Sequence, residues 1–75
     1  MQEQDIINAV QAVIPDAQVE ARMEGNHAHL TVTSTVFQGL SPVKRQQLVY
    51  GALNHAIASG AIHAVHMKTL VPGTH

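Results

Sequence analysis

The chain has 75 residues, no cysteine and two aromatic residues, Phe37 and Tyr50. This length fits one domain with a small, mainly aliphatic core. A net charge of −1 and a charged fraction of 12% argue against strong electrostatic attraction to nucleic acid or anionic membranes. The lack of cysteine excludes disulfides, zinc knuckles and thiol nucleophiles, so the six histidines are the main source of chemistry.

No apolar segment is long enough to span a membrane, because polar residues interrupt each one within a few positions. The polar start, from Gln2 to Asp5, resembles neither a signal peptide nor a transit peptide. We therefore expect a cytoplasmic protein that makes no membrane contact.

The first predicted element is a helix over residues 4–14. Its apolar residues recur at spacings of three and four, which places them on one helical face: Ile6, Ile7, Val10, Val13 and Ile14. Pro15 ends this helix, because the residue before a proline disfavours the helical conformation.

Two alternating segments then predict an antiparallel hairpin. The apolar residues facing one side are Ala17, Val19, Ala21 and Met23 in the first segment, and Ala28, Leu30 and Val32 in the second. Gly25-Asn26 supplies the turn between them.

A long helix is predicted from Pro42 to about Ser59, with Ser41 as its N-terminal cap. Gly51 in its interior costs roughly 1 kcal/mol relative to alanine, so we expect a kink or a break near Tyr50-Gly51. Gly60 suits the position just past the helix end. The buried side is expected to comprise Val43, Leu48, Val49, Leu53, Ala56 and Ile57.

Residues 62–69 predict a third strand. His63, Val65, Met67 and Thr69 should face one way, and Ile62, Ala64, His66 and Lys68 the other, with His66 in solvent. The element order is α-β-β-α-(α)-β, which predicts an α+β fold: a two-layer domain with a three-stranded mixed sheet and helices on one face. We expect residues 1–75 to form one domain, with a flexible tail over residues 70–75.

Two segments resemble signatures of the BolA family. Residues 36–50, VFQGLSPVKRQQLVY, resemble its Phe-x-Gly-x-Ser-x-Val-x-(Arg/Lys)…Val-Tyr signature. Residues 62–65, IHAV, followed by Lys68-Thr69, resemble its Ile/Val-His-Ala-Leu…Lys/His-Thr segment. The order and spacing fit across nearly the whole chain, most closely in the short bacterial branch associated with acid stress.

The resemblance implies a fold related to the class II KH domain and a role in iron–sulfur cluster handling. In that family a [2Fe–2S] cluster lies at an interface with a monothiol glutaredoxin, and the glutaredoxin and glutathione supply thiolates. The family's C-terminal histidine ligand maps onto His63. The second ligand comes from the loop between the first two strands, where His27 and His29 both stay open as candidates. The isolated chain is expected to be a monomer without a cofactor.

Histidine suits this chemistry because a neutral imidazole binds iron, and histidine ligation raises the potential of a cluster relative to thiolate. The residues alone leave a second interpretation open for His63, a histidine that hydrogen-bonds at a strand edge and serves packing. For His27 and His29 the corresponding alternative is a solvated turn histidine.

Two other function classes rank lower. Lys44 and Arg45 at the start of the second helix could contact the phosphates of a nucleic acid. The chain, however, lacks the Gly-x-x-Gly loop of KH modules and has no interleaved aromatic residues for base stacking. No nucleophile–base pair or phosphate loop can be assembled, so we predict a binding and adaptor protein and not an enzyme.

Overall fold

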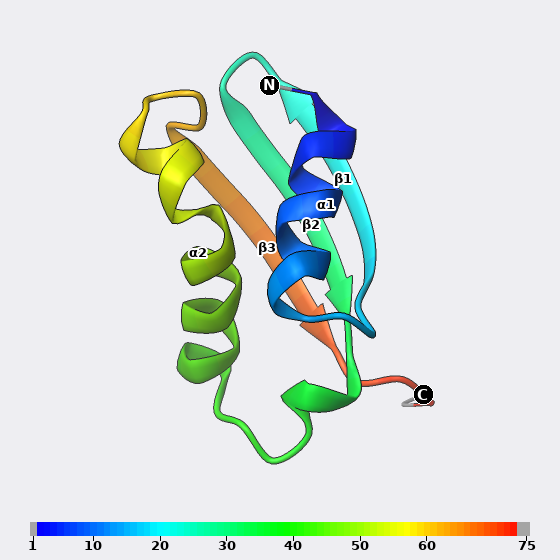
Figure 1. Ribbon diagram of the computed structural model, residues 1–75. Helices are drawn as coiled ribbons and strands as arrows, with labels where there is room; N and C mark the ends of the chain where they lie inside the picture. The colour runs from blue at the N-terminus through cyan, green and yellow to red at the C-terminus, as the bar shows by residue number, and fades with distance from the viewer. Residues whose placement is uncertain (1, 74–75) are drawn as a thin grey trace.

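A three-stranded sheet in the order β1-β2-β3 forms one layer of the computed structural model, which describes residues 2–73 (Figure 1). β1 and β2 pair antiparallel, whereas β2 and β3 pair parallel. Two helices cover one face of this sheet, so the predicted two-layer α+β fold with a mixed sheet is confirmed. The elements are α1 (Glu3–Val13), β1 (Gln18–Glu24), β2 (His27–Thr33), η1 (Thr35–Phe37), α2 (Pro42–Ala58) and β3 (Ala64–Leu70).

The core lies between the sheet and the helices, and the alternation of β2 explains how it forms. Ala28, Leu30 and Val32 are buried, whereas the residues between them point to the open face of the sheet. The short helix η1 closes one end of the core with the buried side chain of Phe37. The helices contribute Ile6, Val10, Val49, Leu53 and Ala56.

α2 is continuous from Pro42 to Ala58, so the predicted kink near Gly51 is wrong. Val49 and Leu53, on either side of Gly51, are both buried and hold the helix against the sheet. This packing outweighs the low intrinsic helix propensity of one glycine.

The predicted buried side of α2 is too wide. Val49, Leu53 and Ala56 are buried, but Val43 is 61% exposed and Ile57 is 36% exposed. Val43 and Ile57 lie seven residues on either side of Tyr50, and this spacing places all three on one helical face. That face is rotated by about 100° around the helix axis from the buried side chain of Val49, because successive helical residues are about 100° apart.

β3 begins two residues later than predicted, because Ile62 belongs to the core and not to the strand. Ile62 is buried, and its N–H donates to the carbonyl of Ala56 at 3.3 Å. At the other end, Leu70 is the last residue of β3 and Val71 packs against the core. The third strand thus extends one residue beyond its predicted end, into the segment predicted to be a flexible tail, and the last two residues of that segment lie outside the described chain.

Asp16 links the turn after α1 to the end of β2. Its carboxylate accepts hydrogen bonds from Ser34 Oγ at 2.6 Å, from Thr35 Oγ1 at 2.8 Å and from Thr35 N–H at 3.1 Å. These bonds, that of Ser34 first, lower the pKa of the Asp16 carboxyl below its ordinary value. The fold therefore favours the ionised form of Asp16.

We expect Gly51→Ala to raise the free energy of unfolding by about 0.5–1 kcal/mol, measured by urea denaturation. A Cβ at this helical position would meet no atom within 4 Å. Gly39→Ala is the matched control, since its Cβ would also meet nothing within 4 Å but its φ is +80°. This control should destabilise the protein by about 1–2 kcal/mol through backbone strain. Destabilisation by Gly51→Ala would contradict the continuous helix.

Asp16→Asn should lower the midpoint of thermal unfolding near pH 7. The pKa of Asp16 is lower in the folded than in the unfolded chain, so its ionised form adds stability above the unfolded value of about 3.9. This contribution is lost as the pH falls through the lower folded pKa, so the two proteins should converge in acid. Glu20→Gln is the control, because Glu20 is exposed and makes no side-chain hydrogen bond in the described chain. A constant difference between Asp16→Asn and wild type at all pH values would contradict this role.

Candidate functional site

His63 lies in the loop between α2 and β3, with an exposed side chain. Its backbone N–H donates to the carbonyl of Asn26 at 2.8 Å. Its ring Nδ1 lies 2.9 Å from the side-chain Nδ2 of Asn26. The histidine is thus anchored to the turn between β1 and β2, through both its backbone and its ring.

The local sequence explains why these two loops meet. Gly25, with φ of +59°, lies in the turn that leads into β2. Gly60, with φ of +82°, ends α2 and redirects the chain so that Ile62 enters the core. The parallel pairing of β2 with β3 then starts at His27 and Ala64, which places Asn26 beside His63.

The two ring nitrogens of His63 have different surroundings. Nδ1 contacts Asn26, whereas Nε2 makes no hydrogen bond to the described residues. Gly60 lies close to Nε2, since a Cβ added to this glycine would be 3.7 Å from that nitrogen, an ordinary van der Waals distance. Nε2 is therefore the ring nitrogen whose hydrogen-bonding capacity the described chain leaves unused.

His27 and His29 lie on the open face of the sheet, where both stack against His66. The ring centroids are 4.7 Å apart for His29 and His66, and 5.8 Å apart for His27 and His66. The interplanar angles are 11° and 15°. His66 is exposed, as predicted, but sequence reasoning missed its contact with His29, because this follows from the strand register alone.

The structure does not bring the three predicted ligands into one cluster. His27 begins β2 at the same end of the sheet as His63, and His29 lies about 6.6 Å further along the strand. Residues 2–73 contain no group of three or more histidine, aspartate or glutamate side chains that could hold a metal ion. The described chain alone therefore supplies at most part of a ligand set.

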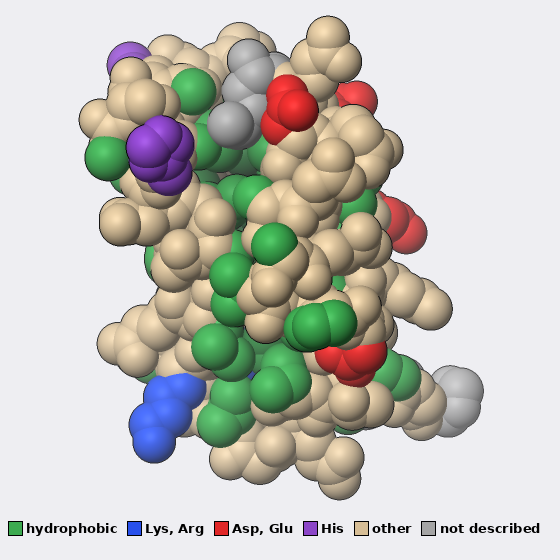
Figure 2. Space-filling model, viewed as in Figure 1, with side chains coloured by type: hydrophobic (Ala, Val, Ile, Leu, Met, Phe, Trp, Pro, Cys, Tyr) green, Lys and Arg blue, Asp and Glu red, His purple; other side chains and the backbone are tan. Residues whose placement is uncertain are grey.

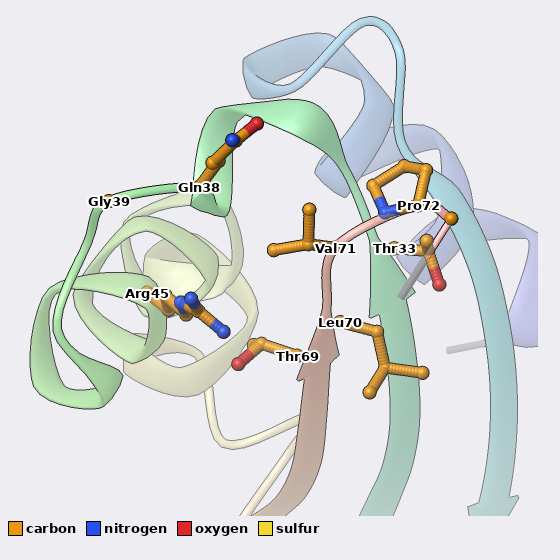
Figure 3. Close-up of a pocket in the computed structure, with 9 residues that line it drawn as sticks. Thr33, Gln38, Gly39, Arg45, Thr69, Leu70, Val71 and Pro72 are labelled. Atoms are coloured by element: carbon orange, nitrogen blue, oxygen red, sulfur yellow. The ribbon is translucent and has the colours of Figure 1, made fainter. Parts of the chain in front are cut away.

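Lys44 and Arg45, the two residues that could contact the phosphates of a nucleic acid, lie in different surroundings. Lys44 is exposed, whereas Arg45 is half-buried and donates from Nε to the carbonyl of Leu40 at 3.0 Å. Figure 3 shows the Arg45 guanidinium extending toward Thr69 in a pocket of about 770 Å³. Arg45 therefore holds the loop before α2 through Nε, and its surroundings differ from those of the exposed Lys44.

Charge is unevenly distributed over the molecule. All five acidic residues precede Gly25, so no carboxylate side chain comes from β2, α2 or β3. On the face shown in Figure 2, the acidic side chains lie over the side of α1 and β1, and the histidine and basic side chains that are visible lie over the side of α2. The loop that carries His63 thus belongs to the part of the chain without acidic side chains.

No helix of the described chain has the length and apolar character needed to cross a membrane.

Comparisons with known proteins agree with the resemblance seen in the sequence. The family described as BolA-like protein matches residues 4–74. The acid stress protein IbaG of Escherichia coli K12 is 38% identical over 69 residues, covering 87% of this chain and 82% of IbaG. An uncharacterized protein of Acinetobacter guillouiae is 36% identical over 70 residues, covering 93% of this chain and 84% of that protein.

A comparison of the fold with solved structures also shows similarity to BolA proteins. A BolA protein homologue from Coxiella burnetii has a solved structure that superimposes with a TM-score of 0.81. The two are 29% identical, and the match covers 96% of this chain and 92% of the other.

We expect His66→Ala to change the ring resonances of His29 and His27 but to leave those of His63 unchanged. The substitution removes the ring on which the other two stack, and His63 is held separately by Asn26. Stability should change by less than about 0.5 kcal/mol, because the side chain is exposed. The measurement is an imidazole proton–nitrogen correlation spectrum. A shift of the His63 resonances as large as that of His29 would show that His63 is not independent of the stacked histidines.

Proposed function

The chain belongs to the BolA family, and on that premise we propose that it binds a monothiol glutaredoxin and shares a [2Fe–2S] cluster with it. Such a complex would act in iron–sulfur cluster trafficking or in an iron or stress response. The observation that carries the proposal is His63, an exposed imidazole anchored through Nδ1 with Nε2 free. In this proposal the protein acts as an adaptor that contributes ligands and surface to a complex, without turnover of a substrate.

The ligand inventory favours a shared cluster. A [2Fe–2S] cluster takes Cys₄ ligation or, in Rieske centres, two histidines in place of two cysteines. This chain has no cysteine, and its described residues form no group of three metal-binding side chains. The missing thiolates would therefore come from the glutaredoxin and from glutathione.

His27 fits the second ligand position better than His29. His27 follows Asn26 in the sequence, and Ala64, its pairing partner on β3, follows His63. His27 is therefore the strand residue next to the contact between Asn26 and His63. Its ring also stacks less closely on His66: the ring centroids of His27 and His66 are 5.8 Å apart, whereas those of His29 and His66 are 4.7 Å apart. A turn of the His27 side chain toward the loop would thus break less packing.

The charges beside the two candidate ligands differ. A cluster held by thiolates carries negative charge, and acidic side chains close to its ligands would oppose its binding. His63 lies in a loop without an acidic residue, whereas His27 pairs across the sheet with Glu24, whose carboxylate forms an ion pair with Arg22 at 3.0 Å. The name of the Escherichia coli relative, an acid stress protein, supports a stress context for this family branch.

The test is a titration of this protein into reconstituted [2Fe–2S] monothiol glutaredoxin, followed by visible absorption and circular dichroism. Wild type should change the spectrum of the cluster, and His63→Ala should abolish that change because the anchored imidazole is lost. His27→Ala should weaken it.

His55→Ala is the matched control, since it removes an exposed histidine of α2 whose ring is not part of the stack of His27, His29 and His66 and does not contact His63 in the described chain. If His63→Ala changes the cluster spectrum as much as wild type does, His63 is not a ligand. A response lost in His29→Ala but kept in His27→Ala would move the second ligand to His29.

A further inference from the structure

Asn26 is the residue that holds His63 in place. It accepts the His63 backbone N–H at 2.8 Å and contacts ring Nδ1 through its side-chain amide at 2.9 Å. In the described chain, no other side chain forms a hydrogen bond with this ring. The orientation of the imidazole therefore depends on one neighbour.

The amide of Asn26 can serve either neutral form of the imidazole. A neutral histidine carries one N–H, and an asparagine side chain offers both a donor and an acceptor. When Asn26 donates from Nδ2 to Nδ1, the proton of His63 is on Nε2, which then has no lone pair for a metal. When the amide is turned over, Oδ1 accepts from Nδ1–H and Nε2 carries the free lone pair. Both arrangements share the same heavy-atom positions.

We infer that Asn26 is a positioning residue that presents Nε2 of His63 as the ligating atom. This inference rests on the proposed function. On metal binding, the Nε2 proton leaves to solvent, Nδ1 takes one proton from solvent, and the amide turns so that Oδ1 accepts it. The imidazole stays neutral throughout. Histidine ligands in metal sites commonly donate their second N–H to such a partner, and the loss of that partner costs about 10–100-fold in affinity.

Ligation through Nδ1 is disfavoured by the same contacts. Nδ1 is occupied by Asn26, and the backbone bond between the two residues keeps that side of the ring against the turn. Nε2 lies near Gly60, where an added Cβ would be 3.7 Å away, and it makes no hydrogen bond to the described residues. The geometry thus distinguishes the two nitrogens, which the sequence alone does not.

Two substitutions separate positioning from simple structural support. Asn26→Ala removes the side-chain contact but keeps the backbone hydrogen bond, and no positive φ is required at this residue. Asn26→Asp provides an acceptor only, so it should favour the Nδ1–H form and leave Nε2 free. Asn54→Ala, at an exposed position on α2, is the control for loss of an asparagine.

The first readout is the imidazole proton–nitrogen correlation spectrum of the free protein. Asn26→Asp should shift His63 toward the Nδ1–H tautomer, and Asn26→Ala should give it a tautomer ratio closer to that of an unconstrained histidine. His66 and the Asn54→Ala control should match wild type. Unchanged His63 signals in both Asn26 variants would overturn the inference, whatever the cluster assay shows.

The second readout is the affinity for [2Fe–2S] glutaredoxin in the titration described above. Asn26→Ala should weaken it by about tenfold or more, and Asn26→Asp should restore it. Equal affinity of wild type and Asn26→Ala would overturn the inference but leave the proposed function standing. If wild type itself does not alter the cluster spectrum, the proposed function and the ligand role of Nε2 both fail, and the tautomer readout then decides only whether Asn26 orients the ring.

Discussion

The parallel pairing of β2 with β3 determines where every candidate ligand lies. The pairing begins at His27 and Ala64 and runs to Thr33 and Leu70, and the Ser34 N–H extends it by donating to the Leu70 carbonyl at 3.0 Å. A parallel pair needs a crossover, and α2 supplies it. Because α2 ends beside the start of β2, the loop before β3 meets the turn before β2. The contact between Asn26 and His63 is a consequence of this topology.

Local patterns were sufficient to predict most of the elements. Alternation in β1 and β2 identified their buried faces, and Ser41-Pro42 marked the start of α2, where Ser41 Oγ accepts from the Lys44 N–H. The errors share one physical origin, because they depend on contacts between distant residues. The packing of Val49 and Leu53 keeps α2 continuous across Gly51, and the burial of Ile62 delays the start of β3. The periodicity of apolar residues within one segment does not show how that segment packs against distant parts of the chain.

The candidate site was predictable only in part, for the same reason. The family segments identified His63, but its partner Asn26 and the accessible nitrogen follow from the meeting of two loops. The stacking of His29 on His66 requires the register of β2 and β3, because a shift of one residue would turn one ring to the other face. The chemical groups of the candidate site can thus be identified from the sequence, but their neighbours cannot.

His27 connects the two histidine environments of the molecule. It stacks loosely on His66 over the open face of the sheet, and it is also the first strand residue beside the loop of His63. One side chain occupies only one of these positions at a time. A His27 that turned toward a shared cluster would therefore leave His66 stacked on His29 alone. The chain lacks cysteine, so the proposed cluster would need thiolates from a second molecule, and its binding would depend on partner concentration. In the proposed complex, the partner would supply both these thiolates and the binding free energy that moves His27 out of the stack.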